Sequence, residues 1–209
     1  ASLGSTDASG TITLNAATPP TVASPVPTRA PADVISLFSD VYTNRPVDTW
    51  SATWDQADVA DVPVGGNVAK KYTKLAFAGV EFISNQINAS AMTHLHIDLW
   101  TQDPSRFSVK LVDFGANGVF GGNDDSEFEV TLSRTSTPSL STGAWNSLDI
   151  PLSAFTGLTG RGHIAQMIIA GASPTIYLDN VYFYKVPVPT SPPVAAPTPT
   201  APAGNVISL

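Results

Sequence analysis

Residues 175–184, which read TIYLDNVYFY, are the stretch that decides the fold class. Their aromatic and β-branched side chains favour one long β-strand. Strict alternation of side chains predicts two faces, one with Ile176, Leu178, Asn180, Tyr182 and Tyr184 and the other with Tyr177, Asp179, Val181 and Phe183. Because both faces are mostly apolar, the strand is expected inside a packed sheet.

Asp179 is the exception in this run, a single carboxylate among apolar and aromatic residues. A buried charge at this position requires a cation or several hydrogen bonds to offset its desolvation. After Lys185 the sequence changes to Pro and Thr, which indicates that residues 175–184 form the last strand of a domain.

Proline-rich tracts flank the domain on both sides. Residues 19–31 and 187–202 together hold 12 of the 18 prolines, and such sequences favour polyproline II spacers. The expected organisation is a tail and linker over residues 1–32, a folded module over 33–185 and a second Pro/Thr-rich linker over 186–205.

The far end of the chain repeats its beginning. Residues 34–37 read VISL and follow Ala-Pro-Ala, and residues 206–209 read VISL after a second Ala-Pro-Ala. We interpret residues 206–209 as the start of a second copy of the module, so the chain is expected to be part of a tandem array.

Within the module almost every segment reads as strand. Short apolar or alternating runs are separated by turn signals such as Asp103-Pro104, Gly121-Gly122-Asn123 and Ser173-Pro174. A single helical turn is expected over residues 151–155. Seven or eight short strands without an amphipathic helix predict an all-β, two-sheet antiparallel β-sandwich of the jelly-roll type.

Composition excludes several classes of protein. The net charge of −7 argues against a nucleic-acid partner, and the absence of Cys rules out disulfides and thiolate metal sites. No apolar run reaches 18 residues, so no membrane span is expected. Few Lys residues and Pro-Thr linkers favour a secreted, extracellular bacterial protein, here a monomeric module in a multidomain chain.

The run from Met92 to Trp100 alternates cleanly, with leucine and isoleucine at every second position. Its other face carries polar and aromatic side chains, and the following run, residues 107–114, adds Lys110. Aromatic planes beside hydrogen-bonding groups are what a sugar-binding cleft requires, since pyranose rings offer both C–H faces and hydroxyls. The alternative is an ordinary solvent-facing sheet surface.

Trp50 and Trp54 lie in a polar segment, and we expect one to cap the edge of the core and the other to offer a sugar platform. The Gly/Asn/Asp-rich loop over residues 114–127 is a second possible location for the site. The predicted ligand-binding residues are Trp50, Trp54, His94, His96, Asp98, Trp100 and Lys110.

Oxygen-rich residues near the two ends of the module suggest a structural calcium site. Jelly rolls bring these ends together, and calcium takes six to eight oxygen ligands. The predicted ligands are Ser39, Asp40, Asn44 and Asp179. The alternative is that Asp179 accepts backbone hydrogen bonds without a metal. His94 and His96 have the spacing of a metal pair, but ordinary cross-strand hydrogen bonding is favoured.

No catalytic set stands out in the sequence. Glu127 and Glu129 share a strand face, but the E-x-D-x-x-E arrangement of β-glucanases is absent, and so are G-x-S-x-G and H-E-x-x-H. The module is therefore predicted not to be an enzyme.

About three-quarters of the chain resembles the jelly-roll, galactose-binding-like carbohydrate-binding modules appended to secreted bacterial polysaccharide-degrading enzymes. The resemblance lies in ADVISLFSDVYTN (32–44), DTW (48–50), KKYTKLAFAGVEF (70–82), MTHLHIDLWT (92–101), KLVDFG (110–115), GGNDDSEFE (121–129), WNSLDIPLSAFTGL (145–158) and YLDNVYFYK (177–185).

This resemblance implies a non-catalytic module that targets a secreted multidomain enzyme to a polysaccharide of the β-glucan or xylan type. It also implies a structural calcium at Asp179, because the equivalent aspartate of such modules commonly binds one. A structural or adhesive β-sandwich repeat of a bacterial cell-surface protein is the alternative function.

Overall fold

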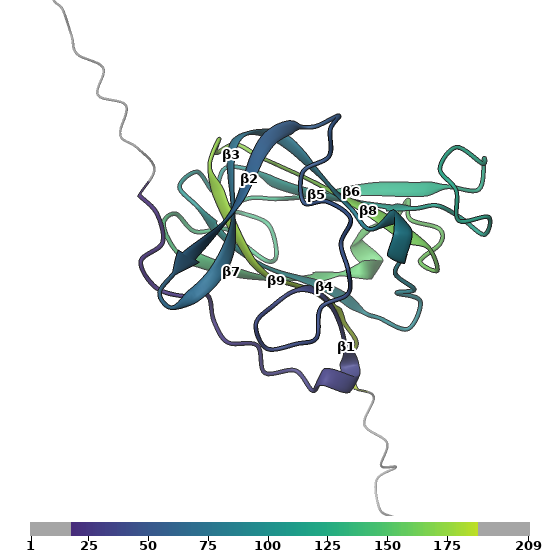
Figure 1. Ribbon diagram of the computed structural model, residues 1–209, viewed down its shortest axis with the longest axis horizontal. Helices are drawn as coiled ribbons and strands as arrows, with labels where there is room; N and C mark the ends of the chain where they lie inside the picture. The colour runs from purple at the N-terminus through teal and green to yellow at the C-terminus, as the bar shows by residue number, and fades with distance from the viewer. Residues whose placement is uncertain (1–17, 188–209) are drawn as a thin grey trace, which may run out of the picture.

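The structure of the protein is a computed structural model that describes residues 18–187 (Figure 1). Strands dominate these residues, and none of the helices within them has the length and apolar character needed to cross a bilayer. The strands are β1 (Val34–Phe38), β2 (Gln56–Val64), β3 (Asn67–Glu81), β4 (His94–Thr101), β5 (Phe107–Asp113), β6 (Ser126–Leu132), β7 (Trp145–Pro151), β8 (Ile164–Gly171) and β9 (Ile176–Tyr184). The 3-10 turns are η1 (Pro31–Asp33), η2 (Ile83–Asn85) and η3 (Leu152–Ala154).

The strands form a curled antiparallel sheet in the order β6-β5-β8-β3-β9-β4-β7, with β1 against β9 and β2 against β3. The long strand β3 joins two layers, because residues 70–72 pair with β9 and residues 77–81 pair with β8. The predicted all-β sandwich is confirmed, and η3 lies within the expected helical turn.

One hydrophobic cluster fills the space between the layers. Leu95, Ile97 and Leu99 of β4 enter it from one layer, and Val109 and Leu111 of β5 enter it from the other. All five are fully buried. Burying each such side chain contributes about 1.5–3 kcal/mol, so this core fixes which face of each strand points outward.

The strict alternation predicted along β9 is wrong beyond Leu178. A β-bulge opposite His96 and Asp98 shifts the register, and Asn180 adopts a left-handed φ of 47°. The extra residue returns Val181 and Phe183 to the core with Leu178. Bulges place two residues opposite one, which is why the later tyrosines of β9 lie on the outer face with Asp179.

Residues 18–30, the second half of the expected N-terminal linker, form neither helix nor strand. They lie along the outer face of β9, β4 and β7 and lead into η1 (Figure 1), and we call them the strap. Ser24 in the strap is buried and donates a hydrogen bond to Asp179. The strap therefore packs on the module instead of extending from it.

Residues 1–17 and 188–209 lie outside the described part of the chain. They include most of the expected second linker, residues 186–205, and the repeated start at residues 206–209.

Candidate functional site

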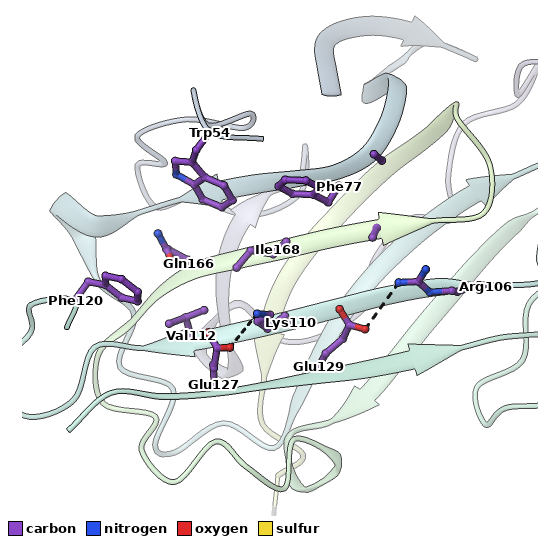
Figure 2. A pocket seen from close by; sticks show the side chains of 12 residues that line it. Trp54, Phe77, Arg106, Lys110, Val112, Phe120, Glu127, Glu129, Gln166 and Ile168 are labelled. Carbon is purple, nitrogen blue, oxygen red and sulfur yellow. Dashed lines mark hydrogen bonds and ion pairs between the residues drawn. The ribbon is translucent and has the colours of Figure 1, made fainter. Parts of the chain in front are cut away.

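A groove of about 770 Å³ crosses the outer face of the β6-β5-β8-β3 layer (Figure 2). Apolar side chains form most of its floor, and charged or polar groups stand along it. Its lining residues are Trp54, Ala76, Phe77, Arg106, Lys110, Val112, Phe120, Glu127, Glu129, Gln166, Ile168 and Ala170.

Trp54 forms one wall as an open aromatic plane. Its side chain is 47% exposed and is stacked on Phe77, with ring centroids 6.2 Å apart and planes 24° from parallel. The indole lies over the backbone of Gly79, where an added Cβ would be 2.6 Å from Trp54 Cζ2. A glycine is thus required for the indole to lie this close to β3.

Glu81 holds this wall in place. Its Oε1 accepts hydrogen bonds from Trp54 Nε1 and from Gln166 Nε2, each at 3.0 Å. Gln166 pairs directly with Glu81 across β3 and β8. One carboxylate oxygen therefore orients the aromatic plane and the neighbouring amide together, before any ligand arrives.

The opposite wall consists of paired charges on β5 and β6. Lys110 Nζ lies 2.9 Å from Glu127 Oε1, and Arg106 lies 4.0 Å from Glu129. These groups are partly exposed, so each pair contributes little to stability. Their donors and acceptors nevertheless face the groove and can bind hydroxyl groups.

Phe120 stands at one end of the groove on the loop between β5 and β6 (Figure 2). It is 65% exposed and packs on Phe114, with ring centroids 5.5 Å apart. Asp124 accepts hydrogen bonds from the backbone and side-chain nitrogens of Asn117, which fixes the loop. A large exposed aromatic on such a loop favours a binding role.

The structure separates the predicted sugar-contacting residues. Trp54 and Lys110 line the groove, whereas Trp50 packs edge-on against Phe38 at the margin of the core. The expectation that β5 follows β4 on one polar face is wrong, because β9, β3 and β8 lie between them in the sheet. The β4 side chains therefore face outward on the other layer.

That second face is largely covered. His94 stacks on Tyr184 and His96 on Tyr182, and Trp100 packs edge-on against Trp145. Pro25, Val26 and Pro27 of the strap lie over His96 and Asp98.

His96 is buried between two carboxylates of this face. Its Nδ1 lies 2.8 Å from Asp149 Oδ1, and its Nε2 lies 3.4 Å from Asp98 Oδ1. Burial lowers the pKa of His96, but the hydrogen bonds to Asp149 and Asp98 outweigh burial and raise it overall. The hydrogen bond with His96 in turn lowers the pKa of Asp149. The geometry is that of a structural network.

Hydrogen bonds hold Asp179, the predicted calcium ligand on β9. Asp179 accepts hydrogen bonds from Ser24 Oγ, Asn67 Nδ2 and the backbone N–H of Asn180. The sequence left open that Asp179 accepts backbone hydrogen bonds without a metal. In the structure it accepts one bond from a backbone N–H and two from side chains.

Two of the other predicted ligands are likewise engaged, since Ser39 donates to Asn180 and Asn44 accepts from Ser36. Asp40 is exposed. Burial raises the pKa of Asp179 to about 6 against the lowering effect of its hydrogen bonds, and the charges of Asp40 and Asp98 add to the rise. No group of three metal-binding His, Asp or Glu side chains occurs within residues 18–187. Calcium stays an untested prediction.

Several residues of the groove were not predicted from the sequence. Phe77, Gly79 and Glu81 alternate along β3, and that pattern alone places them on one outward face. Gln166 is the one polar residue in β8. Phe120 is an isolated aromatic in a Gly/Asn/Asp loop. Each of these signals is present in the sequence, but only the strand order brings them together.

Neither a protein-family model nor a curated protein sequence matches this chain. Solved structures do match it. One is a family 30 carbohydrate-binding module, with a TM-score of 0.54 and 12% identity over 78% of this chain and 93% of that one. Another is the family 30 module of the cellulosomal cellulase Cel9D-Cel44B of Clostridium thermocellum, with a TM-score of 0.53 and 12% identity over 73% and 97% of the two chains. The chain therefore has the jelly-roll fold of the family 30 carbohydrate-binding modules.

Proposed function

We propose that the protein is a non-catalytic carbohydrate-binding module and that it binds polysaccharide in the groove of the β6-β5-β8-β3 layer. The observation that carries this proposal is Trp54, an exposed aromatic plane held beside Glu81 and Gln166. A pyranose ring can stack on this plane while its hydroxyls bond to the polar side chains.

The charges of the groove favour a neutral sugar. Lys110 and Arg106 each have a carboxylate partner in the same wall, so an anionic glycan would have to displace Glu127 or Glu129 to reach them. A β-glucan or an unsubstituted xylan backbone carries no such charge. We infer a ligand of this type.

Attachment to a secreted polysaccharide-degrading enzyme belongs to the same proposal. It is supported by the second family 30 module, which is part of a cellulosomal cellulase. A module that holds such an enzyme on its substrate requires a binding groove and no catalytic acid-base pair of its own.

Affinity electrophoresis tests the function. The protein is run in native gels that contain barley mixed-linkage β-glucan, laminarin or xylan, with bovine serum albumin as the reference. Retardation in at least one gel, lost in Trp54→Ala, is expected. If none of these glycans retards the wild-type protein, the structural or adhesive repeat becomes the better account.

A further inference from the structure

Side chains on the face under the strap bind the strap through its main chain. Five side-chain donors reach four strap carbonyls, those of residues 18, 22, 25 and 29. The bonds run from Trp100 Nε1 (3.3 Å) and Gln102 Nε2 (2.9 Å) to Thr18 O, from Trp145 Nε1 (2.8 Å) to Val22 O, from Asn180 Nδ2 (3.0 Å) to Pro25 O, and from Tyr42 Oη (3.0 Å) to Arg29 O.

This pattern is a way to recognise an extended proline-rich segment. Polyproline II makes no internal hydrogen bonds, so its carbonyls are free for donors such as tryptophan and tyrosine. Because carbonyls carry no side-chain identity, a second segment with the same proline spacing meets the same donors.

The chain contains such a segment. Residues 192–209 align without a gap to residues 20–37, at an offset of 172 positions, and 10 of the 18 aligned residues are identical. The identities run through the strap, at Pro20, Val22, Ala23, Pro25, Pro27 and Thr28, and then through all four residues of VISL. The repeat therefore begins with the strap, well before β1.

The two copies differ at the polar anchors of the strap. Ser24, which donates to Asp179 at 2.6 Å, aligns with Ala196. Arg29, whose guanidinium lies 4.1 Å from the ring centroid of Tyr184, aligns with Ala201. Pro20, Val22, Pro25 and Pro27 are kept, so the second copy retains the main-chain recognition and loses the side-chain contacts of Ser24 and Arg29.

We propose that the outer face of β9, β4 and β7 is a docking site for proline-rich segments of this pattern, and that residues 190–202 are a second strap that docks on another copy of the module. The strap of each module then precedes its own β1.

An exchange of straps in the full-length chain tests this proposal. In one variant residues 18–30 are replaced by the sequence of residues 190–202. In the control variant the same thirteen residues are inserted in scrambled order, with the prolines moved. Thermal unfolding reports stability, and hydrogen exchange of the Trp100 and Trp145 indole N–H groups by NMR reports docking.

We expect the exchanged variant to keep both indoles protected and to lose at most about 10 °C in Tm, since it lacks the buried hydrogen bond of Ser24 to Asp179 and the partly exposed contacts of Arg29. Keeping Ser24 and Arg29 in the inserted strap is expected to restore the wild-type Tm. The scrambled variant is expected to expose both indoles and to melt lower or fail to fold. An exchanged variant that behaves like the scrambled one overturns the proposal, and so does a scrambled variant that behaves like the wild type. Neither readout depends on glycan binding.

Discussion

At the scale of single residues, Gly79 sets how closely Trp54 lies on β3. We expect Gly79→Ala to push the indole off its plane, because the new Cβ would overlap its ring. Affinity for a soluble β-glucan should fall roughly tenfold or more, as for loss of an aromatic anchor, with little change in Tm because Trp54 is half-exposed. Gly171→Ala is the matched control, since its Cβ would meet no atom closer than 3.7 Å. Equal affinity of both variants would remove Trp54 from the binding site.

Phe120 is the second aromatic side chain that we expect to contact the glycan. It lines the groove, whereas its neighbour Val119, which is 64% exposed, does not. Phe120→Ala is therefore expected to weaken binding of a cellohexaose by roughly three- to tenfold and to leave the shorter cellobiose unaffected, while Val119→Ala changes neither. Isothermal titration of the three proteins with the two sugars measures this. A loss that is the same for both sugar lengths would contradict a contact at the end of the groove.

His96 and Asp179 make stability depend on pH. Both groups have a raised pKa in the folded protein, so their contributions are present at low pH and are lost as pH rises, for Asp179 through about 6. Asp149 has a lowered pKa, and its contribution is lost as pH falls below its ordinary value. Tm is therefore expected to be highest near pH 4, at the ordinary pKa of both aspartates, and to decline toward pH 8. His96→Gln should flatten this decline in a calorimetric pH series; an unchanged slope would show that His96 does not titrate as inferred.

At the scale of elements, the alternating strands could be predicted well. β4 and β5 lie within two residues of the alternating runs 92–100 and 107–114, because one buried face imposes a period of two. β2 could not be recognised. Its residues pair only with β3 and are mostly exposed or half-exposed on both faces, so QADVADVPV lacks an apolar stripe.

The candidate site was harder to predict because it depends on strand order. Lys110 was correctly placed on an outward face, but which of Trp50 and Trp54 lies in the groove was left open, and the outward residues of β4 belong to a different layer. The bulge at Asn180 and the docking of the strap could not be predicted either. A proline-rich composition specifies an extended conformation, and it does not specify whether that extended chain packs on a surface.

The predicted calcium site would link two elements, because its ligands lie just after β1 and on β9. The hydrogen bonds to Asp179 leave its carboxylate oxygens satisfied, so we expect EDTA to leave Tm unchanged. Differential scanning calorimetry with about 5 mM EDTA or about 5 mM CaCl₂ measures this. Either concentration is far above the Kd of a tight calcium site. A Tm that rises by several degrees in calcium would restore the predicted metal site and require Asp179 to exchange its donors.

At the scale of the whole molecule, two opposite faces differ in kind. The outer face of β6-β5-β8-β3 is an open groove with an aromatic wall, and the outer face of β9-β4-β7 is occupied by the chain's own strap. We therefore assign glycan binding to the first face and docking of the proline-rich strap to the second. Trp54 lies on the first face and Trp100 on the second, so substitution of one tryptophan at a time shows which face binds the glycan.

The most direct measurement is isothermal titration of barley mixed-linkage β-glucan and xylan into the wild-type protein, Trp54→Ala and Trp100→Ala, all held below their Tm. The wild type is expected to bind at least one glycan, Trp54→Ala to lose that binding, and Trp100→Ala to bind with wild-type affinity. Loss of binding in Trp100→Ala with full affinity in Trp54→Ala would place the glycan site on the β9-β4-β7 face and overturn its assignment to the groove.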